Sequence, residues 1–251
     1  MVTKNNHFIS EYLLKFWLIK PGKIRVFDYH KLIFEDRCTE TLFAKQHIFS
    51  QKQEDFFNKH IERILQQELL TIPNKNYRVK KRKNARALLL FVHDLVGRYC
   101  AAHSKNSEFV DFFTSLSEHD LNQLAHKLNT QYYIGIVTIS DDSKLFFPSN
   151  LLIPIFDPKL KLCHYGVPFT GNNCFFLLKK GFDRLYLESI SQGHAIAKLS
   201  AGNYRTDLVV VHSHYLHNEE ELKRNLLEYR ESNQHIAEQI DLFRHLEQFE
   251  N

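Results

Sequence analysis

The residues best suited to chemistry in the middle of the chain are charged and lie inside an apolar segment. Asp94 and Arg98 stand four residues apart in KKRKNARALLLFVHDLVGRYCAAH (80–103), with His93 beside them. On a helix, residues four apart share a face, so this carboxylate and this guanidinium can pair. An ion pair inside a protein is tolerated when its other hydrogen bonds are satisfied. The pattern predicts a polar group at the centre of the fold.

Two interpretations of this polar group stay open. We favour a buried brace between the N-terminal segment and a sheet, because structural ion pairs perturb pKa values as active sites do. In the other interpretation, Arg98 lies in a pocket with His7 and with Ser149-Asn150, and the His7 imidazole is a general acid or base. The catalytic candidates are then His7, Arg98, Ser149 and Asn150.

A basic run precedes the apolar segment. Six of the nine residues from 78 to 86 are basic: Arg78, Lys80, Lys81, Arg82, Lys83 and Arg86. The run falls at the start of the predicted helix, where the helix dipole disfavours cations, so another use for the charge is plausible. The cluster could neutralise the phosphates of a nucleic acid. A solvated run of charge is the more common outcome, and no interleaved aromatic residues mark a reading motif.

Two sets of residues could hold a metal. His212 and His214 follow an apolar run, and alternate residues of a strand face the same way, so the pair could bind zinc if Glu219 or Glu220 added a ligand. The alternative is a strand end that enters a polar loop. The second set is Asp28, Glu35 and Lys31, which superficially fits the carboxylates and lysine of a magnesium-dependent nuclease. Zinc or magnesium is thus compatible with the sequence, but neither is required.

These residues must be positioned by helices and strands whose periodicity can be read from the sequence. The 80–103 segment is apolar on nearly all sides, which predicts a central helix wrapped by other elements. Helical spacing also predicts helices over 7–18, 39–47, 53–70, 107–116, 117–128, 185–199, 219–230 and 236–249. Apolar, β-branched and aromatic runs predict strands over 23–28, 32–36, 132–139, 145–147, 151–156, 161–165, 174–179 and 207–212.

The order of these elements predicts the fold class. Helices and strands are largely segregated along the chain, which favours α+β over a doubly wound sheet. We expect one domain over residues 1–251, with a mixed or largely antiparallel sheet packed by helices around the central buried helix.

Composition sets limits on the partners and the compartment. The formal net charge is +4, which permits a polyanionic partner without demanding one. The four cysteines form no CxxC pair and indicate no disulfide framework. No apolar run is long enough to cross a bilayer. We therefore expect a reduced, cytoplasmic protein with no membrane partner, whose oligomeric state the sequence does not set.

The opening stretch NHFISEYLLKFW (6–17) resembles the start of an uncharacterised, mainly bacterial family, domain of unknown function 4238, which typically opens His-Tyr-Val-Pro-x-x-Tyr-Leu-x-x-Phe. Looser landmarks of the family correspond to residues 26–28, 60–69, 98, 147–150 and 167–170 of this chain. The chain departs from the pattern where Ser10 replaces a proline, Leu13 a tyrosine and Asn150 an aspartate. The resemblance implies a fold and candidate positions, among them Arg98 and Asn150, but no reaction.

Two functions follow as hypotheses. The first is a nucleic-acid-acting, nuclease-like protein with an acid–base pocket at His7, Arg98, Ser149 and Asn150, and with the basic run as its nucleic-acid contact. The second is a non-catalytic binding or regulatory module that retains the fold, as Asn150 in place of an aspartate suggests.

Overall fold

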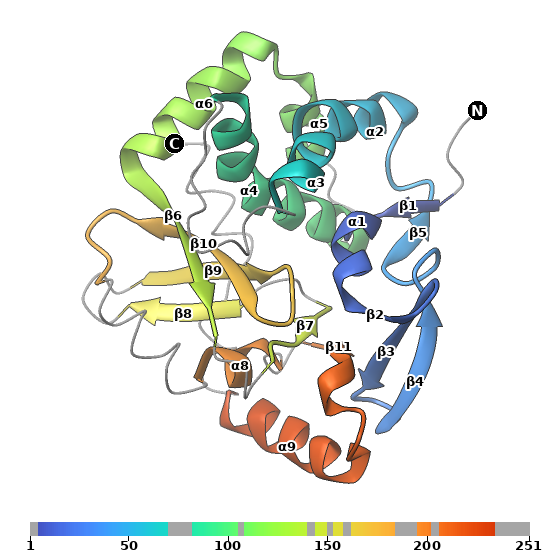
Figure 1. Ribbon diagram of the computed structural model, residues 1–251. Coiled ribbons are helices and arrows are strands. Elements are labelled where there is room, and N and C mark those ends of the chain that lie inside the picture. The colour runs from blue at the N-terminus through green and yellow to red at the C-terminus, as the bar shows by residue number, and fades with distance from the viewer. Residues whose placement is uncertain are drawn as a thin grey trace.

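The computed structural model describes residues 5–69, 82–104, 108–139, 144–149, 153–157, 162–183, 195–201 and 206–233 of the 251-residue chain. Within these ranges α2 to α6 gather on one side of three antiparallel sheets, and α8 and α9 lie on the opposite side, as Figure 1 shows. The predicted α+β class, with antiparallel sheets and a buried helix, is confirmed.

The central helix is α4, Arg82–Ser104. Every described side chain from Arg86 to Arg98 is buried, because the helix is apolar on all sides and other elements surround it. Helices α3, α5 and α6 and strand β9 contact it, and Phe91 packs edge-on against Phe175 of strand β10. The prediction of a sequestered helix in this part of the chain is confirmed.

Four helical segments and one π-helical turn cover α4 (Figure 1). They are α2 (Gln51–Phe57), the π-helical turn η2 (Asn58–Glu62), α3 (Arg63–Leu69), α5 (Glu108–Ser115) and α6 (Glu118–Gln131). Two of these helices, α2 and α6, begin with a capping box. Ser50 exchanges hydrogen bonds with Gln53 at the start of α2, and Ser117 does so with Asp120 at the start of α6.

The second half of the chain contributes a four-stranded antiparallel sheet in the order β6 (Tyr132–Thr138), β10 (Asn173–Lys179), β9 (Leu162–Pro168) and β8 (Ile153–Asp157). Every residue of β10 from Asn173 to Leu178 is buried, as its continuous apolar run requires of a strand covered on both faces.

A five-stranded antiparallel sheet joins the two halves of the chain. Its strands are β2 (Leu18–Lys20), β3 (Lys23–Asp28), β11 (Leu208–Val211), β7 (Phe147–Pro148) and β4 (Ile33–Cys38). Strand β11 lies between β3 and β7, and β4 pairs with the other edge of β3. Residues near 28, 149 and 207 therefore meet at one end of this sheet. Helix α8 (Ala195–Ser200) precedes β11 in the chain, and α9 (Glu219–Ser232) follows it and lies lowest in Figure 1.

The N-terminal region differs from its prediction in two places. Residues 7–18 are not one helix: β1 (Asn5–His7) precedes α1 (Glu11–Leu14) and the 3-10 turn η1 (Lys15–Trp17). The helix predicted over 39–47 is wrong. A turn there leads into β5 (Ala44–Gln46), which pairs with β1. Phe43 and His47 adopt left-handed φ angles of 58° and 55°, which a right-handed helix excludes.

Other predictions fall partly or wholly outside the described residues. The helix predicted over 236–249 lies outside them. Of the helix predicted over 185–199, residues 185–194 also lie outside them. Among the described residues, no helix combines the length and apolar character that a membrane span needs.

Candidate functional site

Arg98 lies at the centre of a buried polar cluster. Its side chain is 1% exposed, its Nε donates to Asp94 Oδ1 at 3.0 Å, and its Nη1 lies 2.7 Å from Glu62 Oε1. The guanidinium lies over the Phe57 ring, 3.8 Å from its centroid. Two groups of the N-terminal segment complete the contacts of Nη1, the Ser10 hydroxyl at 3.3 Å and the His7 carbonyl oxygen at 3.4 Å. The predicted Asp94–Arg98 pair is present, and its geometry is that of a brace.

The cluster holds more carboxylates than cations. Glu54 accepts a hydrogen bond from Asn6 at 2.8 Å, while Glu62 accepts one from Ser10 at 2.5 Å. Burial, reinforced by the nearby Glu62 and Glu54 and opposed by Arg98, raises the pKa of Asp94 to about 6. Burial also raises the pKa of Glu54, although Arg98 and Asn6 oppose the shift. The cluster is therefore a place where protons bind more readily than to ordinary carboxylates.

The structure brings the predicted catalytic candidates together only in part. His7 meets Arg98 through its backbone, while its ring Nε2 lies 3.0 Å from the Thr39 carbonyl oxygen. Because a carbonyl oxygen only accepts, Nε2 of His7 carries the proton. Ser149 is not in this cluster; it lines a separate pocket, to which Phe8 also contributes. Asn150 lies outside the described residues.

That pocket has a volume of about 360 Å³. It lies where the end of α4, the turn before β5 and the ends of β7 and β11 meet. Its lining residues are Phe8, Arg37, Cys38, Thr41, Leu42, Phe43, Ala44, Lys45, His103, Ser149, Asp207 and Leu208. Apolar rings and aliphatic groups, cations, a carboxylate, hydroxyls and a thiol thus face one space of the size that small-molecule sites have.

His103 is the acid–base group of this pocket. Its Nδ1 lies 2.8 Å from the Tyr99 carbonyl oxygen, one helical turn earlier, so Nδ1 carries the proton and Nε2 the lone pair. The ring stacks on Tyr99 with centroids 4.0 Å apart and meets Phe8 edge-on at 5.0 Å. Burial lowers the pKa of His103 below 6.5; Lys45 also lowers it, while the Tyr99 carbonyl and Asp207 oppose the shift. His103 is therefore a neutral proton acceptor near pH 7.

Lys45 supplies the positive charge beside His103. Its ammonium donates to the Ala102 carbonyl at the end of α4, a neutral acceptor that leaves the charge of the ammonium uncancelled. No carboxylate of the described residues lies within ion-pair distance of Lys45.

Phe43 forms an aromatic wall of the pocket in a strained conformation. Its φ of 58° is unusual for a bulky residue, and such strain persists only where the surroundings enforce it. Here the Phe43 carbonyl accepts from Phe8 N at 3.0 Å, and the Phe43 ring lies 5.9 Å from that of Phe8 and 6.5 Å from that of Phe147. Strained residues of this kind concentrate at functional sites, which supports the pocket as a site.

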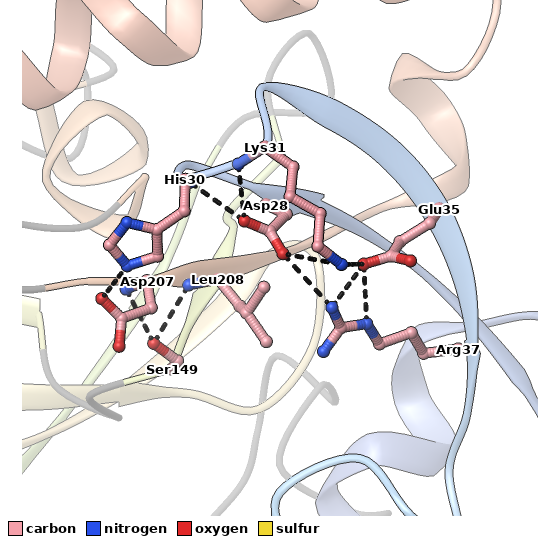
Figure 2. Close-up of polar contacts among 8 residues, drawn as sticks. All are labelled: Asp28, His30, Lys31, Glu35, Arg37, Ser149, Asp207 and Leu208. Atoms are coloured by element: carbon pink, nitrogen blue, oxygen red, sulfur yellow. Dashed lines mark hydrogen bonds and ion pairs between the residues drawn. The ribbon is translucent and has the colours of Figure 1, made fainter.

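Four charged side chains at one end of the β3–β4 hairpin pair with one another, as Figure 2 shows. Asp28 Oδ2 lies 3.3 Å from Arg37 Nη2 and 3.6 Å from Lys31 Nζ, and Glu35 pairs with the same two cations. The other oxygen of Asp28 accepts the backbone N–H groups of His30 and Lys31. Burial opposes these contacts, but the hydrogen bonds and the cations keep the pKa of Asp28 below its ordinary value. The set predicted as a magnesium site is a balanced ion-pair group.

Ser149 is held at the end of β7 by the neighbouring strand. Its Oγ accepts the backbone N–H groups of Asp207 and Leu208, both at 3.2 Å, and its own N–H donates to the Leu208 carbonyl at 2.8 Å (Figure 2). The Asp207 carboxylate lies 2.9 Å from His30 Nε2. The hydroxyl oxygen is thus fixed by two backbone donors, and among the described residues no side-chain base is hydrogen-bonded to it that would make it a nucleophile.

The basic run is only partly described. Arg78, Lys80 and Lys81 lie outside the described residues, and nothing is described of the Arg82 and Lys83 side chains. Arg86 is 7% exposed and directed inward, where its Nη1 donates to Glu118 at 2.5 Å and to Asn122 at 3.2 Å. Arg86 therefore ties α4 to α6 instead of facing a phosphate.

The expectation of two histidines on one strand face is wrong. Strand β11 ends at Val211, and His212 caps the 3-10 turn η3 (Ser213–Tyr215), where its Nδ1 accepts from the His214 N–H at 3.1 Å. His214 lies inside that turn, and the Glu219 carboxylate pairs with Arg25. Across the described part of the chain, no three His, Cys, Asp or Glu side chains form a group that could hold a metal.

The pocket residues His103, Lys45 and Asp207 were not among the sequence candidates. The spacing of Tyr99 and His103 on one helix face is the only local signal for the histidine, and nothing in the sequence joins position 45 or 207 to it.

Comparisons with protein-family models, with curated proteins and with solved structures gave no match to this chain. The resemblance to domain of unknown function 4238 stays a prediction, and the site must be interpreted from its own geometry.

Proposed function

We propose that the protein acts on nucleic acid or on its components, through the pocket at the end of α4. The observation that carries the proposal is the meeting of a neutral histidine, His103, with the uncancelled cation of Lys45 and with the aromatic wall of Phe8 and Phe43. An anionic ligand with an aromatic part matches these three features, and nucleotides have both.

The proposed reaction is hydrolysis of a phosphate ester. Nε2 of His103 takes a proton from a water molecule, whose oxygen forms a bond to phosphorus while the bond to the leaving oxygen breaks. The proton then passes to the leaving oxygen, so that water is added across the cleaved bond. The Lys45 ammonium offsets the negative charge of the phosphoryl oxygens. Arg98 is buried, is bonded to the His7 carbonyl and does not line the pocket, so its role is to hold the N-terminal segment.

Cleavage assays with His103→Gln test this function. General acid–base catalysis contributes about 100-fold or more, so we expect a loss of that size in the rate of cleavage of a single-stranded substrate, with and without magnesium. His126→Gln, an exposed histidine on α6, is the matched control and should cleave as the wild type does. Equal rates for wild type and His103→Gln would remove His103 from the reaction.

A binding or regulatory module is the second candidate. It is favoured by the full burial of Arg98, which takes one predicted catalytic residue away from any ligand. In that case the wild type binds nucleotides without turnover, and His103→Gln changes affinity alone. The same assays therefore separate the two functions.

A further inference from the structure

We infer that the pocket takes one unpaired nucleotide, with its phosphate at Lys45, so that the substrates are single strands, strand ends or free nucleotides and not intact duplexes. This inference rests on the proposed function and names its substrate class.

The size of the pocket sets the first limit. A volume of about 360 Å³ lies near the lower end of the roughly 300–1,000 Å³ that small-molecule sites span. Such an open pocket has room for one ligand of nucleotide size. A base in a duplex is stacked and paired, so it would have to leave the helix before it could enter.

The charges of the lining place the phosphate. Arg37 shares its charge with Asp28 and Glu35, whereas Lys45 meets only a neutral carbonyl. A lysine ammonium has three N–H donors, and the Ala102 carbonyl takes one of them, which leaves two for phosphate oxygens. The phosphate therefore lies at the Lys45 end, beside His103, whose pKa responds to Lys45.

The rest of the lining suits the neutral part of a nucleotide. Phe8 and Phe43 are 5% and 6% exposed, so they offer the ligand the apolar edges of their rings, and Leu208 adds further apolar contact. Such contact suits the neutral, flat part of a nucleotide. The Asp207 carboxylate lines the same space and repels an anion, which keeps the phosphate away from it. A carboxylate instead accepts hydrogen bonds from sugar hydroxyls or base amino groups.

Calorimetric binding measurements on the full chain test the inference. The probes are a nucleoside 5′-monophosphate, the same nucleoside without phosphate, and inorganic phosphate. The main variant is Lys45→Gln, which removes the charge and keeps a polar side chain with N–H donors. Lys52→Gln, an exposed lysine on α2, is the matched control.

We expect the monophosphate to bind more tightly than the nucleoside. Lys45→Gln should weaken monophosphate binding about tenfold or more and leave nucleoside binding unchanged, because only a charge-assisted contact is lost. Lys52→Gln should change neither. Lys45→Arg, which keeps the charge, should retain most of the monophosphate affinity, and equal melting temperatures of the variants show that folding is intact.

Competition experiments separate the substrate classes. A single-stranded oligonucleotide should displace the bound monophosphate, and the blunt duplex of the same sequence should not. Displacement by both to the same extent, or unchanged monophosphate affinity in Lys45→Gln, would overturn the inference even if nucleic acid is still cleaved. If no nucleotide or nucleic acid binds and none is cleaved, the proposed function fails with it.

Discussion

At the scale of single residues, the chemistry proposed for the pocket depends on the protonation of one imidazole. His103 is useful as a base because its Nδ1 proton is bound to its own helix and its pKa lies below the ordinary value. Two charged neighbours act on that pKa in opposite directions, since Lys45 disfavours the imidazolium form and Asp207 favours it.

This opposition predicts the pH dependence of two variants. Lys45→Gln removes a positive charge, so the pKa of His103 should rise and the acidic limb of the pH–rate profile should move to higher pH. Asp207→Asn removes a negative charge, so it should lower the pKa of His103 and move the acidic limb of the pH–rate profile to lower pH. NMR titration of the His103 ring gives the pKa directly. Shifts of the two variants in the same direction would contradict the arrangement.

Arg98 is the residue on which the buried cluster depends. Arg98→Met would leave Asp94 and Glu62 without their counter-charge in the interior, and breaking a buried ion pair in this way costs about 3–5 kcal/mol. Urea unfolding should show this loss. Arg86→Met is the control and should cost less, because the partner Glu118 is mostly exposed and can be hydrated. Equal losses in the two variants would contradict the central role given to Arg98.

At the scale of elements, helix α4 connects the cluster to the pocket. Arg98 braces β1 from one side, and five residues later His103 contacts Phe8, which directly follows β1. The close packing of α4 depends on Gly97, where an added Cβ would come within 2.4 Å of the Phe109 ring of α5.

Gly97→Ala therefore offers a test in which two effects have opposite signs. In an exposed helix the change would stabilise by about 1 kcal/mol, because alanine is the better helix former. Here the clash with Phe109 should prevail and destabilise by about 1–3 kcal/mol. Thermal unfolding measures which effect is larger. The double variant Gly97→Ala/Phe109→Leu should recover part of the stability that Gly97→Ala loses. A more stable Gly97→Ala would show that α5 does not pack on α4 as described.

The elements that the sequence predicted well are those with long periodic patterns. The helix predicted over 80–103 corresponds to α4 (Arg82–Ser104) and the strand predicted over 23–28 to β3, because burial around a helix and alternating burial along a strand leave a clear periodic signal. The 39–47 segment was wrongly predicted as a helix. Its pairing with β1 and the left-handed Phe43 are tertiary effects, and a short local pattern does not contain them.

At the scale of the whole molecule, the pocket is assembled from segments far apart in the chain. Position 8, the segment 37–45, the end of α4 and the ends of β7 and β11 meet only because β11 lies between β3 and β7. A single sequence does not reveal such pairings. For this reason the sequence placed Ser149 in an acid–base pocket but associated it with His7 instead of His103.

The buried cluster also predicts how overall stability varies with pH. The pKa of Asp94 is about 6 in the folded state and 3.8 as the ordinary value. Because the pKa of Asp94 is higher in the folded than in the unfolded state, its protonation stabilises the fold below about pH 4. This stabilisation is lost as the pH rises through 6, and the free energy of unfolding falls by about 3 kcal/mol in total. Relative to Asp94→Asn, the wild type should therefore become less stable between pH 4 and 6. The urea midpoints of the two proteins across this pH range measure the change. A difference between wild type and Asp94→Asn that stays constant with pH would contradict the buried titration.

The most direct measurement of the pocket's role is NMR of histidine-labelled protein during titration with a nucleoside monophosphate. The His103 ring signals should shift and saturate with the ligand, and the same titration of Lys45→Gln should need about tenfold more ligand. The signals of His7, whose Nε2 is bound to the Thr39 carbonyl, should move far less. A titration in which His103 stays unmoved, or in which His7 alone responds, would contradict the assignment of this pocket as the site.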